Sequence, residues 1–211
     1  MKYLFLLVTL SFFSAASYSQ DAKAQGILDK LSAKIKAQKS FYVEFTAQIK
    51  STSGGNENIT GKGWVKGNKF AATYGENTII SNGVKTWTIV KEEGSVYESD
   101  ASNDSEGMNP KKLMTLWESG FKNKFEKEDK LGNEAVYVIN LYPKDAKKAD
   151  YHTITLYISK ATNDLKKAVM KSKNGSTMTY TLTKFQSNAP VDDSKFVFDP
   201  KKYPGYHVVK D

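Results

Sequence analysis

Few side chains in this sequence are of the types that catalyse reactions or bind metals. The 211 residues include no Cys and two His, His152 and His207. Without cysteine the chain forms no disulfide, thiolate zinc site, iron–sulfur cluster or thiol nucleophile. Two histidines do not complete a three-histidine metal site, and His152 follows Asp150 and Tyr151 in a pattern typical of an exposed strand edge. We therefore expect no metal, no cofactor and no enzymatic activity.

One glycine-rich segment resembles a nucleotide-binding loop at first sight. Gly61, Gly63 and Gly67 lie close together, but the third glycine is one place late and no helix is expected after it. A dinucleotide loop needs that helix, because its N-terminus binds the pyrophosphate. We interpret these glycines as places where a strand bends within a curved sheet.

The positive charge of the chain comes from lysine alone. Its 31 basic residues exceed its 23 acidic residues, the formal net charge is +8, and the sequence contains no Arg. Sites for phosphates and bases rely heavily on the bidentate guanidinium group of arginine. We therefore interpret the basic residues as a solvated surface and expect no nucleic-acid partner.

Residues 1–19 are typical of a secretory signal peptide. A positive charge at Lys2 precedes an apolar run over 4–13, and small residues follow. Cleavage after Ser19 is our prediction and cleavage after Ala16 is the alternative. No Cys follows the apolar run, so a lipid anchor is not expected, and no later stretch reaches the about 20 apolar residues of a membrane-spanning helix. Residues 20–211 are then one exported, soluble and monomeric domain.

Periodicity in this domain predicts one helix followed by a long antiparallel sheet. Over 22–38 the apolar residues recur every three or four positions, which indicates one buried helical face. Beyond it the apolar residues alternate, as in strands, and Asn82-Gly83 and Asn174-Gly175 are strong hairpin signals. The predicted strands are 41–49, 59–66, 69–74, 78–81, 84–90, 95–99, 121–130, 134–142, 151–159, 165–173 and 176–186.

A second helix is predicted over 109–119, inside the β region. Asn109 is a suitable N-cap, Pro110 suits the first helical position, and Gly120 ends the apolar pattern. About eleven meander-like strands with two helices indicate a mainly β fold. We expect an incomplete antiparallel β-barrel with a helical lid.

Several strands carry large apolar side chains on both alternations, although a sheet with one solvated face is apolar on only one. One explanation is a filled core with a few surface aromatics. The functional explanation is an internal hydrophobic cavity for a greasy ligand. The residues that we expect to line it are Ile35, Phe45, Phe70, Tyr74, Trp87, Met114, Trp117, Tyr137, Ile139 and Tyr180.

Phe70 allows the sharpest form of this hypothesis. Ala72 and Tyr74 share its alternation, so all three side chains are expected on the same face, toward the cavity or its rim. An ordinary core position for Phe70 is the alternative. The two differ in whether a carboxylate at this position unfolds the protein or blocks its function.

In the order and spacing of its motifs, nearly the whole domain resembles the LolA family of periplasmic lipoprotein carriers. The segments that carry the resemblance are the first helix running into Phe41-Tyr-Val-Glu-Phe45-Thr, Gly61-Lys-Gly-Trp64-Val65-Lys66 leading to Phe70, Ile79-Ile-Ser-Asn82-Gly83-Val-Lys85-Thr-Trp87, Pro110, Phe196-Val-Phe198-Asp-Pro200 and Pro204-Gly205-Tyr-His-Val208-Val209.

The resemblance implies a half-open barrel whose cavity binds the acyl chains of lipoproteins. It implies an inner-membrane ABC transporter complex as donor, an outer-membrane acceptor, and the periplasm of a Gram-negative bacterium as location. The chain departs from the family at Gly67, where better-known members have an arginine that ties the lid to the barrel.

Two other classes of function remain open beside lipoprotein transport. One is a carrier or sensor of another lipid or lipidated ligand, in which a related fold serves as a binding module. The other is a secreted hydrolase of lipids or glycans, which the scarcity of histidine and of catalytic motifs argues against.

Overall fold

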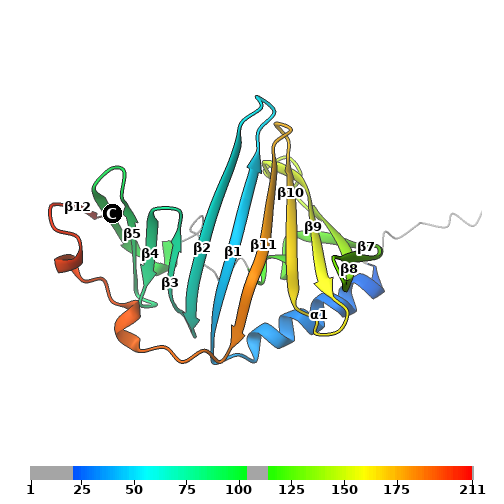
Figure 1. Cartoon of the computed structure of the whole chain (residues 1–211), viewed down its shortest axis with the longest axis horizontal. Coiled ribbons are helices and arrows are strands. Elements are labelled where there is room, and N and C mark those ends of the chain that lie inside the picture. Colours follow the sequence, from blue (N-terminus) through cyan, green and yellow to red (C-terminus); the bar gives the residue numbers. More distant parts are fainter. Residues whose placement is uncertain (1–20, 104–113, 211) are drawn as a thin grey trace, which may run out of the picture.

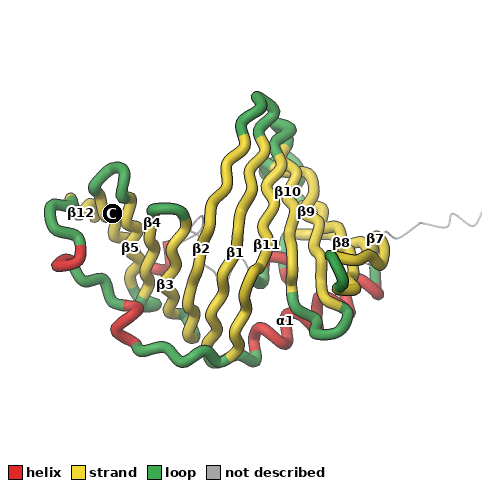
Figure 2. Tube along the Cα trace, viewed as in Figure 1, coloured by secondary structure: helices red, strands yellow, loops and turns green. Residues whose placement is uncertain are grey.

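One open β-sheet dominates the computed structural model, which describes residues 21–103 and 114–210 (Figure 1). The sheet does not close, because β12 and β7 lie at its two ends with no further strand beyond them among these residues. One α-helix, α1 (Ala22–Lys36), covers part of one face, and short 3₁₀ helices interrupt the loops (Figure 2). The prediction of a mainly β fold built as an incomplete barrel is confirmed, with one helix, α1, over the sheet.

The sheet order is β12-β6-β5-β4-β3-β2-β1-β11-β10-β9-β8-β7. The strands are β1 (Ser40–Lys50), β2 (Asn56–Lys66), β3 (Lys69–Tyr74), β4 (Asn77–Ser81), β5 (Lys85–Val90), β6 (Ser95–Asp100), β7 (Phe121–Leu131), β8 (Glu134–Pro143), β9 (Tyr151–Ser159), β10 (Leu165–Ser172), β11 (Thr177–Ser187) and β12 (His207–Lys210). The 3₁₀ helices are η1 (Ala101–Asn103), η2 (Leu116–Glu118), η3 (Asp193–Phe196) and η4 (Pro200–Lys202).

Tight turns join most strands that are consecutive in the chain, and glycine supplies the backbone conformation that several of these turns need. Gly67 has φ +60° between β2 and β3, and Gly175 has φ +84° between β10 and β11. Residues with a Cβ rarely adopt this left-handed region, whereas glycine adopts it freely. Gly67 therefore has a local role, because an arginine in its place would strain this turn.

The helix face of the sheet, defined as the face that α1 covers, carries the main core. Ile27, Leu28, Leu31 and Ile35 lie at helical spacing and pack onto alternating residues of the strands. The sheet residues of this cluster include Phe41, Val43, Val65, Phe70, Ala72, Ile79, Ile139, Leu141, Ile154, Leu156 and Ile158. The predicted shared face of Phe70, Ala72 and Tyr74 is confirmed, because all three belong to or pack against this cluster.

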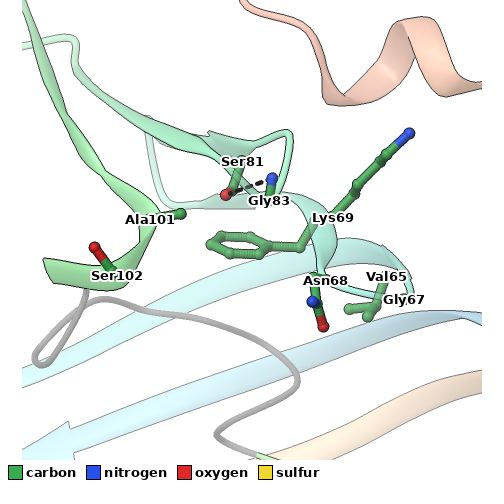
Figure 3. Close-up of a pocket in the computed structure, with 9 residues that line it drawn as sticks. Val65, Gly67, Asn68, Lys69, Ser81, Gly83, Ala101 and Ser102 are labelled. Atoms are coloured by element: carbon green, nitrogen blue, oxygen red, sulfur yellow. Dashed lines mark hydrogen bonds between the residues drawn. The ribbon is translucent and has the colours of Figure 1, made fainter.

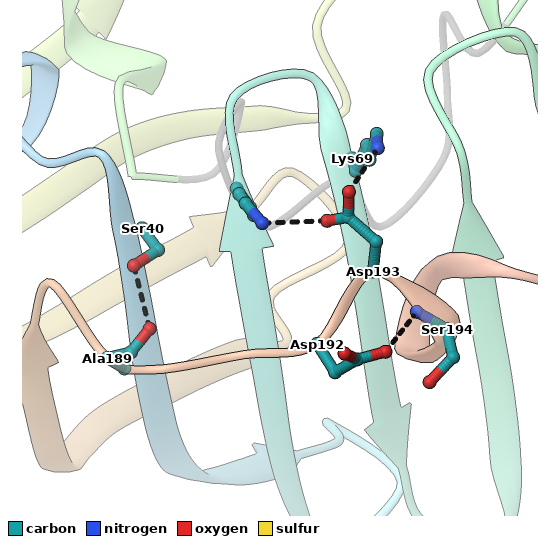
Figure 4. A network of polar contacts seen from close by, with 7 residues as sticks. Ser40, Lys69, Ala189, Asp192, Asp193 and Ser194 are labelled. Atoms are coloured by element: carbon teal, nitrogen blue, oxygen red, sulfur yellow. Dashed lines mark hydrogen bonds and ion pairs between the residues drawn. The ribbon is translucent and has the colours of Figure 1, made fainter.

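The opposite face, here called the tail face, is covered by the C-terminal segment 189–206. Phe196 is fully buried against Ala71, Ile80, Ile89 and Val96, and partly buried aromatic side chains surround this cluster. Polar contacts fasten the segment to the sheet (Figure 4): the Ser40 hydroxyl donates to the Ala189 carbonyl, and Asp193 pairs with Lys69. Over β2 to β6, this segment therefore covers the second apolar alternation of the strands.

Four expectations need correction or lie outside the description. The sheet has a twelfth strand, β12, which pairs in parallel with β6 and was missed because all four of its residues are exposed. The strands are not a simple meander, since β1 pairs with β11. Of the helix predicted over 109–119, residues 109–113 lie outside the described residues, and the rest forms turns and the 3₁₀ helix η2, whose C-cap Ser119 is extended. The signal peptide over 1–19 also lies outside them.

Candidate ligand-binding cavity

An apolar cavity of about 190 Å³ lies on the helix face, beside α1. Strands from both halves of the sheet form its walls, and β1 and β11 run through the middle. The lining residues are Val43, Phe45, Lys62, Gly63, Ala72, Thr73, Tyr74, Met114, Leu116, Ile154, Leu165, Ala168, Met170, Tyr180 and Leu182. Apart from Lys62 and Thr73, these side chains offer mainly carbon, sulfur and aromatic surface, so the cavity suits an apolar ligand.

Small residues account for much of this space. Gly63 and Ala72 are direct partners on β2 and β3, and Ala168 lies on β10. Larger side chains at these inward positions would fill the space, as they do elsewhere in the core. Met114 and Met170 adapt their shape to a ligand because their side chains are unbranched and flexible.

The mouth of the cavity includes an exposed apolar side chain. Leu116 lines the cavity and is 37% exposed, whereas its neighbours Met114 and Trp117 are buried. A ligand that enters beside Leu116 remains in contact with apolar surface as it leaves water.

Polar contacts tie α1 over the helix face. The Asp21 carboxylate accepts hydrogen bonds from the backbone N–H groups of Ala24 in α1 and of Phe125 in β7. Further along the helix, Gln25 accepts from Asn123 and Ser32 accepts from the indole N–H of Trp117 at 2.8 Å. Two ion pairs follow, Lys34–Asp164 at 2.6 Å and Lys36–Glu118 at 2.7 Å. These contacts fasten α1, the helical lid, to β7, to η2 and to the loop between β9 and β10.

The described residues that line the cavity include no His, Asp, Glu or Ser. Burial raises the pKa of Tyr180, so its hydroxyl stays protonated, and it donates only to the Met178 sulfur. Outside the cavity, His152 is exposed and bonds to Thr153. Among residues 21–103 and 114–210, no group of three or more His, Cys, Asp or Glu side chains is placed to bind a metal. Within the same residues, no helix combines the length and apolarity that crossing a bilayer requires.

The structure brings four of the ten predicted residues to the cavity itself: Phe45, Tyr74, Met114 and Tyr180. Ile35, Phe70, Trp117 and Ile139 lie in the adjacent helix-face core, where they are at most 5% exposed. Tyr137 packs against the same core, beside Phe125. Trp87 lies on the tail face, stacked on Phe198, and the structure does not bring it to the cavity.

The prediction missed most of the smaller lining residues. Gly63, Ala168, Leu165 and Leu182 have no distinctive type, although small residues at inward-facing strand positions are a signal of unfilled space. Phe70 borders a separate cleft of about 270 Å³ that is lined mainly by polar and glycine residues, Ser81 and Gly83 among them (Figure 3). A third hollow, about 440 Å³ on the tail face, is lined by charged side chains that include Lys62 and Lys195. Only the helix-face cavity is predominantly apolar among these three.

Comparisons with known proteins assign the chain to a family. A family profile described as "Outer membrane lipoprotein carrier protein LolA" matches residues 31–199. Among curated proteins, no sequence matches the chain significantly. An uncharacterized conserved protein from Thermus thermophilus has a similar fold, with TM-score 0.62, 14% identity, and coverage of 90% of this chain and 99% of that chain.

Two further solved structures are more distant. A LolA superfamily protein from Nitrosomonas europaea matches with TM-score 0.43 and 14% identity, over 83% of this chain and 97% of that chain. A chain of the Pseudomonas aeruginosa MucA/MucB complex matches with TM-score 0.42 and 14% identity, over 84% of this chain and 62% of that chain.

Proposed function

Because the chain belongs to the LolA family of outer membrane lipoprotein carrier proteins, we propose that it carries lipoproteins by binding their acyl chains in the helix-face cavity. The observation that supports this most is the cavity itself, an apolar space lined by strands of the helix face and by Met114 and Leu116. On this proposal the protein works in the periplasm. It receives lipoproteins from an inner-membrane ABC transporter complex and delivers them to an outer-membrane acceptor as a monomer.

Burial of methylene groups is the driving force for binding. Each buried methylene contributes about 0.8 kcal/mol, so part of one acyl chain already gives useful affinity. A cavity of about 150 Å³ is enough to hold benzene. The cavity volume of about 190 Å³ therefore accommodates the end of one acyl chain, with the remainder of that chain near the mouth at Leu116. Such partial burial keeps the complex weak enough for release to an acceptor.

Incubation with detergent-solubilised lipoproteins, followed by mass spectrometry of what copurifies, tests the proposal. The matched pair of variants is Ala168→Phe, which fills the cavity, and Ala161→Phe, which adds the same group to an exposed turn. We expect lipoproteins to copurify with the wild type and with Ala161→Phe, and not with Ala168→Phe. Capture by all three proteins alike, or by none, would refute the proposal.

The small volume of the cavity favours a second candidate, a carrier or sensor of a single-chain lipid. One chain end fills about 190 Å³, whereas the several chains of a lipoprotein do not enter together. The same copurification experiment distinguishes the two, because free fatty acids without lipoproteins in the mass spectrum would support the second candidate.

A further inference from the structure

The position of one aromatic ring sets how much of the cavity is open. Phe45 lies on β1, half-buried, at the wall of the cavity. Its partner on β2 is Gly61, and its partner on β11 is Leu182. The register between β1 and β11 shifts at Glu44/Phe45, a β-bulge of the kind that redirects side chains beside functional sites.

The ring of Phe45 occupies the place where residue 61 would have a side chain. A Cβ atom added to Gly61 would lie 2.1 Å from Cζ of Phe45 and 2.5 Å from Cε1. Gly61 is not among the glycines with positive φ, so its backbone does not itself require glycine. The absent side chain at position 61 therefore serves to make room for the ring.

Two neighbours limit where the ring of Phe45 can move. On the β11 side, the ring of Tyr180 lies with its centroid 6.4 Å from that of Phe45. On the β2 side, the ring already covers Gly61. The open volume of the cavity, whose wall Phe45 forms, is the space that we expect a ring displaced from Gly61 to enter.

We propose that Gly61 fixes the size of the ligand cavity by holding the ring of Phe45 outside it. The proposal rests on the proposed function, and it makes Gly61 a positioning residue that acts through Phe45. The magnitudes are suited to this role. A phenyl ring has the size of benzene, which fills a cavity of about 150 Å³. Turned inward, it takes up part of the 190 Å³ and leaves less of it for an acyl chain.

The test measures binding of cis-parinaric acid, a fluorescent fatty acid, to four variants and the wild type. Gly61→Ala is expected to bind about tenfold more weakly, the loss of about two buried methylene groups. In the Phe45→Ala background the same substitution is expected to change binding little, because no ring remains to be displaced. Gly26→Ala is the matched control, since a Cβ added there in α1 meets nothing within 4 Å.

Each outcome separates this inference from the proposed function. If the wild type does not bind the fatty acid, acyl binding is refuted. If the wild type binds and Gly61→Ala binds equally well, the positioning role is refuted while acyl binding stands. Equal losses from Gly61→Ala in the presence and absence of the Phe45 ring would also refute it. Failure of Gly61→Ala to fold, with Gly26→Ala intact, would mean that the cavity cannot accept the ring and would overturn the inference too.

Discussion

Removal of the Asp21 carboxylate tests whether α1 is fastened to the sheet as the structure indicates. Oδ1 of this residue accepts from the backbone N–H groups of Lys23 at 3.0 Å and Ala24 at 3.1 Å, which caps the helix. Oδ2 accepts from the N–H of Phe125 at 2.9 Å, 104 residues away in β7. One side chain thus both begins the lid and attaches it.

The expected loss of stability in Asp21→Ala has two parts. An N-cap replaced by alanine costs about 1 kcal/mol. A hydrogen bond to a charged group contributes about 1.5–3 kcal/mol. Together they give about 3 kcal/mol, which for a domain of this size lowers the melting temperature by about 6–12 °C. The melting temperature of Asp21→Asn is expected to lie between those of the wild type and Asp21→Ala, because the single carbonyl oxygen of asparagine replaces only one of the two acceptors.

The stability that the Asp21 carboxylate contributes depends on pH through the pKa of this group. The N–H groups of Ala24 and Phe125 lower the pKa of Asp21 below its usual value. Its stabilising effect is therefore complete above the unfolded-state pKa of about 3.9 and is lost as the pH falls through the lower folded-state value. The gap in melting temperature between wild type and Asp21→Ala should be full at pH 7 and shrink in strong acid.

Thermal melts by circular dichroism across this pH range provide the measurement. Asp145→Ala is the control, because that carboxylate also accepts from two backbone N–H groups, of Lys147 and Lys148, but only within its own turn. A decrease in melting temperature in Asp21→Ala no larger than in Asp145→Ala would refute the account of the lid attachment. A difference in melting temperature between wild type and Asp21→Ala that does not depend on pH would refute it too.

Three further outcomes are expected. Phe70→Glu should lower the melting temperature by at least about 6 °C, because the ring is 3% exposed in the core and its removal alone costs about 3–5 kcal/mol. A normal melting temperature with blocked lipid transfer would contradict this prediction. Trp117→Phe should cost about 1–3 kcal/mol in urea denaturation, since the buried Ser32 hydroxyl loses its donor; an unchanged midpoint would show that water replaces it. Binding of cis-parinaric acid should be unchanged by EDTA, and competing fatty acids should displace the probe. Loss of binding in EDTA would reveal a metal site.

Local sequence signals predicted the strands well, because turn chemistry and alternation act over a few residues. Gly83 and Gly175 lie at left-handed turns where the hairpins were expected. The pairing of β1 with β11 could not be predicted in this way, since strand periodicity does not specify which distant edge a strand joins. β12 carries no alternation at all, with its four residues exposed.

Apolar side chains on both faces of the strands were expected to line a cavity. For part of the sheet, the C-terminal segment covers them instead. Trp87 and Trp64 face the tail side, where Phe198, Tyr203 and Tyr206 of the C-terminal segment pack around them. The pattern of apolar residues shows that a face is covered and does not show by what. This is why Trp87 was expected at the cavity and lies on the other side of the sheet, whereas Phe45 and Tyr180 line the cavity.

An open apolar cavity has a cost that its ligand can offset. At about 24 cal/mol per Å³ for unfilled core volume, the 190 Å³ cavity corresponds to about 4–5 kcal/mol of lost stability. About six buried methylene groups, at about 0.8 kcal/mol each, restore that amount. The free protein retains its fold because the tail-face cluster and the ties on α1 lie outside the cavity. On the proposed function, a ligand of one acyl chain would therefore bind by supplying packing that the protein itself lacks, and it would be released without loss of the contacts that hold the sheet and lid together.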